Sequence, residues 1–223
     1  MKKFADIRAV TFDVGNTLIE AWPSVGHVYA EVAAAHGHPG LATEDLNRRF
    51  RAAFRAHGKA VNTKPEWAWI VGETFAGSLS KPACERIFPE LYDRFTQPGA
   101  WRVFEDVEPT LRGLRGRGLK LGVISNWDDR LRPLLHTLRL AEWFDAIVIS
   151  CEAGASKPAR AIFETAMAQL GVPAPALLHV GDNWELDVAG ANAAGAAGVQ
   201  VDRRAAVFSE SQIGSLLDLL AWV

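Results

Sequence analysis

Four apolar segments of this 223-residue sequence are each followed by side chains that could do chemistry. In chain order these residues are Asp13 and Thr17, then Ser125 and Asn126, then Lys157, and finally Asp182 with Asp187. Two or three carboxylates close to one another cannot all stay ionised unless a cation joins them, and hard oxygen ligands suit Mg²⁺. Lys157 and the Ser125 hydroxyl would offer a positive charge and a hydrogen-bond donor to an anionic group. This set fits phosphoryl transfer, in which an aspartate nucleophile forms an aspartyl-phosphate that water then hydrolyses.

Strands and helices must alternate for these residues to meet. The sequence pattern predicts strands over 10–12, 119–124, 146–149, 176–180 and 198–201. Helices are predicted over 109–117, 129–138, 159–170, 185–194 and 212–220. Strands separated by helices of this length imply parallel pairing, so the predicted fold class is α/β, with a Rossmann-like parallel sheet core and helices on both faces. Ligands bind beyond the carboxyl ends of such strands, which is where the polar residues fall.

Residues 21–97 interrupt this alternation. Between Val25 and Gln97 the apolar residues recur at helical spacing and no strand is predicted, whereas strand and helix alternate again after Pro98-Gly99. We therefore expect an α/β hydrolase core made of residues 1–20 and 98–223, with an inserted all-helical cap domain at 21–97 that is long enough to bury a small core of its own. A helical insert next to a catalytic strand end is typical of a lid.

Composition excludes several classes of protein. A hydrophobic content of 49% and a charged content of 22% are typical of soluble globular proteins, and at net charge −2 the scattered basic residues form no stripe for nucleic acid. No run approaches the roughly 18 apolar residues of a membrane span, and the first residues lack the pattern of a signal peptide. We expect a cytoplasmic monomer or homodimer that binds a small phosphorylated molecule and neither nucleic acid nor membrane.

In their order along the chain, the four groups resemble the motifs of the haloacid dehalogenase superfamily. The matching segments are Asp13-Val-Gly-Asn-Thr17-Leu, Ile124-Ser125-Asn126, Ser156-Lys157-Pro158, and Val180-Gly181-Asp182 with Asp187. Each motif is weak alone, but the four in this order are specific, and they span the whole predicted core. The helical insert resembles the C1 cap of subfamily I. The resemblance implies a phosphatase-like hydrolase with Mg²⁺ as its cofactor.

The resemblance also implies catalytic roles for four residues. Asp13 would be the nucleophile, and Thr17 would support the loop that follows it. Ser125 would hold a phosphoryl oxygen, while Lys157 would brace both Asp13 and the phosphate.

Further roles concern the metal and the substrate. The metal ligands implied by the resemblance are the Asp13 carboxylate, the Gly15 carbonyl, Asp182 directly, and Asp187 from one layer further out. The residues expected to contact the substrate are Gly15, Asn16, Ser125, Asn126, Lys157, Trp22 and Trp127. Both tryptophans flank the predicted site, although tryptophans serve more often in packing than in ligand stacking.

Gly15 departs from the family pattern. Phosphatases of this family usually carry a second aspartate two residues after the nucleophile, which acts as general acid and base. With Gly15 there, no side chain remains to protonate a leaving alkoxide, and such help is worth about 10²–10⁴ in rate. We therefore expect slow turnover of alkyl phosphates, and a natural substrate that has a good leaving group, such as an acyl phosphate or anhydride, or that supplies its own acid.

Two other functions stay open at the level of sequence. The 2-haloacid dehalogenases also lack that aspartate and act through an aspartyl ester without metal, but they usually carry an aromatic residue in place of Gly15 and Ser-Asn in place of Gly181-Asp182. A catalytically weak binding protein would be expected to lose other catalytic residues as well. Because Asp182 and Asp187 would serve a metal, they favour the phosphatase.

Overall fold

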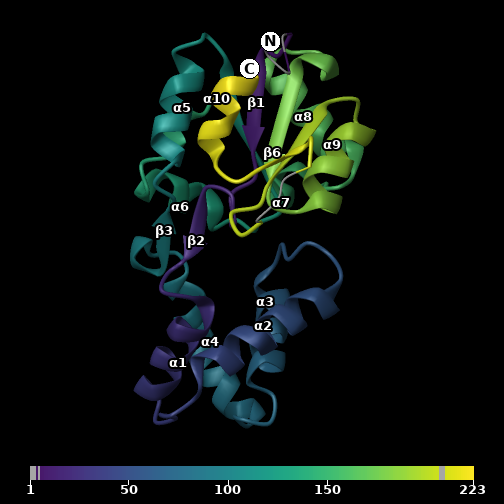
Figure 1. Cartoon of the computed structure of the whole chain (residues 1–223). Helices are drawn as coiled ribbons and strands as arrows, with labels where there is room; N and C mark the ends of the chain where they lie inside the picture. The colour runs from purple at the N-terminus through teal and green to yellow at the C-terminus, as the bar shows by residue number, and fades with distance from the viewer. Residues whose placement is uncertain (1–3, 5, 206–208) are drawn as a thin grey trace. The chain divides into compact units, whose positions relative to one another are not determined.

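The chain folds into two compact units. The structure, a computed structural model, describes residue 4 and residues 6–205 and 209–223. One unit comprises Met1–Ile19 and Val103–Val223, and the other Glu20–Arg102 (Figure 1). Strands β2 (Ile19–Ala21) and β3 (Trp101–Val103) pair in a two-stranded sheet where the chain passes from one unit to the other. These three-residue strands were not predicted, because they are too short to show a pattern.

The first unit is built on a six-stranded parallel sheet with the order β5-β4-β1-β6-β7-β8. Its strands are β1 (Ala9–Phe12), β4 (Lys120–Ser125), β5 (Ala146–Ile149), β6 (Leu177–Gly181), β7 (Ala197–Val201) and β8 (Gln212–Ile213). All residues of β1 and β6 are buried, which is why these segments are almost wholly apolar. The register pairs Phe12, the last residue of β1, with Val123 on one side and Val180 on the other, so the three central strands end within two residues of one another.

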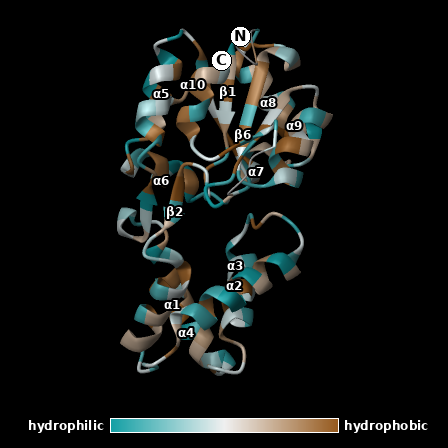
Figure 2. Cartoon of the chain, viewed as in Figure 1, coloured by the Kyte–Doolittle hydropathy of each residue, from teal (hydrophilic) through white to brown (hydrophobic). Residues whose placement is uncertain are grey.

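Helices cover both faces of this sheet, which confirms the predicted α/β fold (Figure 1). They are α5 (Val107–Arg115), α6 (Leu131–Thr137), α7 (Ser150–Ala153), α8 (Arg160–Leu170), the π-helical turn η4 (Trp184–Ala189), α9 (Gly190–Ala193), and α10 (Leu219–Trp222). Helix α8 shows why such segments become helical. Its buried residues Ile162, Phe163, Ala166, Met167 and Leu170 recur at helical spacing, so they form one apolar stripe against the sheet. Figure 2 shows that strand β6 is largely hydrophobic, whereas helix α5 also carries hydrophilic residues.

The predicted helix over 212–220 begins too early. Gln212 and Ile213 instead pair in parallel with Gln200 and Val201 and add the sixth strand to the sheet. Helical structure starts only after Ser215, which accepts a hydrogen bond from the Leu217 backbone N–H. The apolar residues that follow do lie in helical turns, so the prediction mistook the end of a strand for the first turn of a helix.

The second unit contains four helices with an aromatic core. These are α1 (Val25–Ala35), α2 (Thr43–His57), α3 (Lys64–Phe75) and α4 (Lys81–Arg94). Tyr29 stacks on Phe75 with ring centroids 5.5 Å apart, and Phe95 meets the same tyrosine edge-on at 6.1 Å. Helix α3 begins with a capping box between Thr63 and Glu66. Each of these features joins residues within this unit, so it has a core of its own.

No helix in the described ranges is both long enough and apolar enough to cross a lipid bilayer.

Helices α1 and α2 approach closely at Gly26. A Cβ added at this position would lie 2.2 Å from the Thr43 carbonyl oxygen, and the Gly26 backbone N–H donates to Asn47 Oδ1 over 2.7 Å. We expect Gly26→Ala to lower the free energy of unfolding by about 1–3 kcal/mol, because the helices must move apart. Gly72 in α3 is the matched control, since a Cβ there meets nothing within 4 Å.

Urea unfolding of both variants checks this prediction. Gly72→Ala should stabilise the protein by up to about 1 kcal/mol, because alanine favours a helix over glycine. Equal shifts of the same sign in the two variants would contradict the close approach.

Candidate active site

The sheet order brings three of the predicted residues to neighbouring strand ends. Asp13 directly follows the central strand β1, and its backbone N–H donates to the Val180 carbonyl over 2.8 Å. Ser125 is the last residue of β4 on one side, and Asp182 directly follows β6 on the other. Because parallel strands present their carboxyl ends at one edge, these side chains meet there. Lys157 joins them from the loop between α7 and α8.

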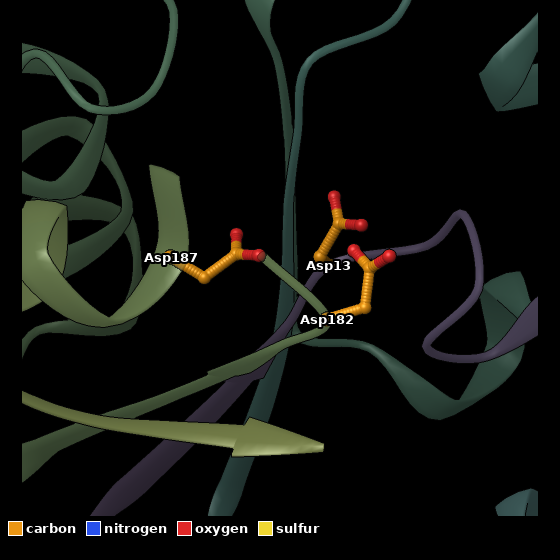
Figure 3. Close-up of side chains that lie close together, drawn as sticks. All are labelled: Asp13, Asp182 and Asp187. Carbon is orange, nitrogen blue, oxygen red and sulfur yellow. The ribbon is translucent and has the colours of Figure 1, made fainter. Parts of the chain in front are cut away.

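Three carboxylates form an acidic cluster at this edge. Asp13, Asp182 and Asp187 each offer an oxygen, and these oxygens all lie within 4.8 Å of one another. Figure 3 shows Asp13 and Asp182 side by side, with Asp187 pointing toward them from the helical turn η4. Asp13 and Asp182, which are 169 positions apart in sequence, thus share one site because the sheet pairs β1 with β6.

Lys157 lies between two of these carboxylates. Its ammonium nitrogen is 2.6 Å from Asp13 Oδ1 and 2.5 Å from Asp187 Oδ1, and the residue is only 4% exposed. Burial alone would lower the pKa of the Lys157 ammonium, but the two carboxylates overcome it and hold the pKa above its usual value. Lys157 therefore stays charged.

The Asp13 carboxylate is held through a single oxygen. The Ser125 hydroxyl donates to Oδ1 over 2.9 Å, and the Lys157 ammonium donates to that same atom. Among the hydrogen bonds of the described residues, both that reach this carboxylate therefore end on Oδ1. This arrangement leaves Oδ2 as the oxygen that can attack an electrophile.

Asp187 is buried, and both of its carboxylate oxygens accept hydrogen bonds. Besides Lys157, its carboxylate accepts from His179 Nε2 over 3.1 Å and from the Asn183 backbone N–H over 2.9 Å. Burial opposes ionisation, but Lys157 and His179 hold the pKa of Asp187 well below its usual value. The carboxylate also folds back over the end of β6, where a Cβ at Gly181 would lie 2.1 Å from its Cγ. Only glycine fits there, which explains the Gly181-Asp182 pair of the sequence motif.

Asp182 carries the charge that the site leaves unbalanced. Burial, and then the nearby Asp13 and Asp187 carboxylates, raise the pKa of Asp182 to about 7. Its Oδ2 accepts from the Asn16 amide over 3.2 Å, and its backbone carbonyl accepts from the Gln200 amide over 2.9 Å. When all three carboxylates are ionised, one ammonium leaves two negative charges, so the charge and the hard oxygen donors both fit a divalent cation.

Asn126 and Thr17 lie in the α/β unit at positions that support the loops of the site. The Asn126 side chain accepts from the Lys157 backbone N–H over 2.7 Å and donates to the Lys157 carbonyl over 2.9 Å. Thr17 is fully buried, and its carbonyl accepts from Arg203 over 2.9 Å. Asn126 thus ties the end of β4 to the lysine loop, and Arg203 holds the loop after Asp13.

Gly15 and the two candidate tryptophans differ in their surroundings. A Cβ at Gly15 would lie 3.5 Å from Cζ3 of Trp127, so the indole borders the position where an aspartate would project. Trp22 belongs to the helical unit, where the Arg102 guanidinium lies 3.6 Å from the centre of its ring. Trp127 is therefore the tryptophan that the α/β unit itself brings beside Gly15.

Sequence reasoning missed His179 and Thr11. Both are fully buried, and they pair in the register of β1 and β6 directly beneath the acidic cluster. One signal was available, because His179 is a polar residue inside the otherwise apolar segment 177–180. A buried histidine in such a strand needs polar partners, which here are Thr11 and Asp187.

Known proteins resemble this chain in sequence and in fold. The family model described as haloacid dehalogenase-like hydrolase matches residues 7–195. "Haloacid dehalogenase-like hydrolase domain-containing protein 3" from Mus musculus is 37% identical over 202 residues, which cover 85% of this chain and 79% of that protein. A HAD phosphatase from Thermococcus onnurineus superposes with a TM-score of 0.66 at 25% identity over 96% of both chains. The L-2-haloacid dehalogenase from Xanthobacter autotrophicus, with a TM-score of 0.71 at 19% identity over 96% of this chain and 97% of its own, shares the fold.

We expect Mg²⁺ to stabilise the folded protein more at high pH than at low pH. With its pKa raised from 3.8 to about 7, Asp182 contributes stability that is present at acid pH and lost as the pH rises through about 7. A cation bound beside ionised Asp182 reverses that loss. Below pH 7 a proton competes with the cation, so the apparent Kd for Mg²⁺ should weaken about tenfold for each pH unit.

Thermal unfolding with Mg²⁺ and with chelator, at about pH 6 and about pH 8, measures this linkage. Asp182→Asn is the control, and it should remove the difference between the two pH values. An equal Mg²⁺-dependent rise in Tm at both pH values in the unmodified protein would contradict the expectation that a proton and Mg²⁺ compete for Asp182.

Proposed function

Because the chain belongs to the haloacid dehalogenase-like hydrolase family, we propose that it is a Mg²⁺-dependent phosphatase that acts on a small phosphorylated metabolite through an aspartyl-phosphate on Asp13. One observation carries this proposal. Asp13 is held through Oδ1 by a buried ammonium and a hydroxyl, beside a carboxylate cluster whose two uncompensated charges suit a divalent cation. The similarity to the HAD phosphatase from Thermococcus onnurineus also supports a phosphatase.

Asp13 would carry out the first step. Its Oδ2 attacks phosphorus and forms the new P–O bond, while the bond from phosphorus to the leaving-group oxygen breaks and that oxygen takes the electron pair. Lys157 and Ser125 keep the carboxylate in one orientation during the attack, since both bind Oδ1. Water then attacks phosphorus of the aspartyl-phosphate, which releases phosphate and a proton and restores Asp13.

The Asp13 carboxylate, the Gly15 carbonyl and Asp182 would hold Mg²⁺ directly. Asp187 would support the ion from behind these ligands, since its oxygens already accept from Lys157, His179 and the Asn183 N–H. The ion would neutralise the phosphoryl oxygens, which otherwise meet a negative site. Asp187 has a second task in this account, because it also holds Lys157 against Asp13.

The leaving group decides which phosphates are good substrates. Gly15 offers no proton at the position where the family usually has an acid, so a stable leaving anion is favoured. Acyl phosphates and anhydrides have such leaving groups. We therefore propose that the substrate belongs to these classes or supplies its own acid.

The remaining expectations stand as proposals of the same kind. We propose that the helical unit serves as the cap and that Asn16, Asn126, Trp22 and Trp127 contact the substrate. The near-neutral charge supports a small-molecule partner and no nucleic acid. We also propose that the protein acts in the cytoplasm as a monomer or homodimer and has no membrane partner.

Release of phosphate tests the proposed function directly. The panel contains p-nitrophenyl phosphate, acetyl phosphate and several sugar phosphates, each with Mg²⁺ and with chelator, and Asp13→Asn is the blank. We expect metal-dependent release that favours acetyl phosphate and vanishes in the blank. Chloride set free from 2-chloropropionate regardless of metal, with no phosphate released, would make the protein a dehalogenase. No release of either ion would favour a binding protein.

A single substitution tests the leaving-group argument. Gly15→Asp should raise turnover of an alkyl phosphate by about 10²–10⁴, because it restores a general acid. The Cβ has room at 3.5 Å from Trp127. Gly15→Asn is the matched control, since it has nearly the same shape and cannot donate a carboxyl proton. Unchanged alkyl phosphate turnover in Gly15→Asp would show that the missing acid does not limit the reaction.

A further inference from the structure

A chain of buried hydrogen bonds runs beneath the acidic cluster. Thr11 Oγ1 lies 2.9 Å from His179 Nδ1, and His179 Nε2 lies 3.1 Å from Asp187 Oδ1. The same Asp187 oxygen lies 2.5 Å from the Lys157 ammonium, which in turn contacts Asp13. Thr11, His179 and Asp187 are at most 1% exposed. The chain therefore connects the middle of the sheet to the nucleophile without passing through solvent.

Hydrogen-bonding capacity fixes how the His179 ring faces Asp187. The Asp187 carboxylate only accepts, so Nε2 of the ring carries an N–H and donates over 3.1 Å. The other ring nitrogen, Nδ1, lies 2.9 Å from the Thr11 hydroxyl, which also lies 3.4 Å from the Leu178 carbonyl. Thr11 thereby holds the ring on the side that faces away from Asp187.

The orientation of the ring is fixed by packing as well. Phe163 meets the His179 ring edge-on, with centroids 5.3 Å apart and an interplanar angle of 82°. Because β1 and β6 pair Thr11 with His179 in register, the backbone sets the separation of the two side chains. His179 thus presents its Nε2–H to Asp187 from a rigid support.

We propose that His179 and Thr11 are positioning residues, which fix the Asp187 carboxylate and, through it, the place of the Lys157 ammonium beside Asp13. Asp187 Oδ1 receives Lys157 and His179 together, while Oδ2 receives the Asn183 backbone N–H. Without His179 the carboxylate keeps the Asn183 N–H on Oδ2 but loses one of the two donors that hold Oδ1. The ammonium would then no longer be held at a fixed distance from Asp13. The kinetic consequence of this inference rests on the proposed phosphatase function, whereas its structural part does not.

The kinetic test compares variants that differ by one hydrogen bond. His179→Leu removes the donor to Asp187, whereas His179→Gln keeps an N–H of similar reach. Thr11→Val removes the hydroxyl with little change of shape, and Thr11→Ser keeps it. Substitution of groups that orient such ligands costs about 10–100-fold, so we expect His179→Leu to lower kcat by that factor with KM nearly unchanged. His179→Gln and Thr11→Ser should recover most of the loss.

A stability control separates positioning from folding. Leu178→Val shortens a fully buried neighbour on the same strand and should lower Tm without changing kcat. If His179→Leu and Thr11→Val lower Tm like this control and leave kcat unchanged, the two residues are merely structural and the inference is overturned.

A spectroscopic arm works even if the protein releases no phosphate. Imidazole ¹⁵N spectra of the whole chain should show His179 protonated at Nε2. Thr11→Val should shift the Nδ1 signal, and Asp187→Asn should shift the Nε2–H signal. A ring without a proton on Nε2, or one whose signals are unchanged in Thr11→Val, would overturn the inference. Absence of phosphate release with the expected spectra would instead overturn the proposed function and leave the hydrogen-bond chain standing.

Discussion

The Lys157 ammonium between the buried Asp13 and Asp187 carboxylates is the interaction on which the site depends. Its two contacts, of 2.6 and 2.5 Å, join three distant parts of the chain. Asp13 follows strand β1, Lys157 lies in the loop after helix α7, and Asp187 lies in the helical turn η4. Loss of one partner from a buried ion pair typically costs about 3–5 kcal/mol, because the remaining charge is left in a medium that solvates it poorly. The same ammonium orients the carboxylate that we propose as the nucleophile, so stability and the proposed chemistry depend on one contact.

The topology of the sheet fixes the positions of the residues around Lys157. The central strand β1 carries Asp13, its neighbour β4 ends at Ser125, and its other neighbour β6 is followed by Asp182. Side chains on strand ends are positioned by the ladder itself, which is more rigid than a long loop. Gly181 then permits the close approach of Asp187, and the Asn126 amide fixes the backbone of Lys157. The acidic cluster is left with two negative charges that a divalent cation would balance.

Much of this arrangement could be predicted because it follows from strand ends. Asp13, Ser125 and Asp182 each stand where an apolar run stops, and the parallel topology then requires them to meet. The strand at 212–213 escaped prediction, since two residues carry no periodicity and only pairing with β7 reveals it. His179 escaped for a different reason. In sequence it is one polar residue in a strand, and its role exists only through Thr11 and Asp187, which long-range pairing brings to it.

Covalent trapping tests whether Asp13 is the nucleophile that we propose. The protein is mixed with acetyl phosphate and Mg²⁺, quenched in acid within a turnover, digested and examined by mass spectrometry. A nucleophilic Asp13 should leave a phosphoryl group on the peptide that contains it, and none on the corresponding peptide of Asp13→Asn. Phosphate release with the phosphoryl group on another residue, or on no residue at any time, would contradict it.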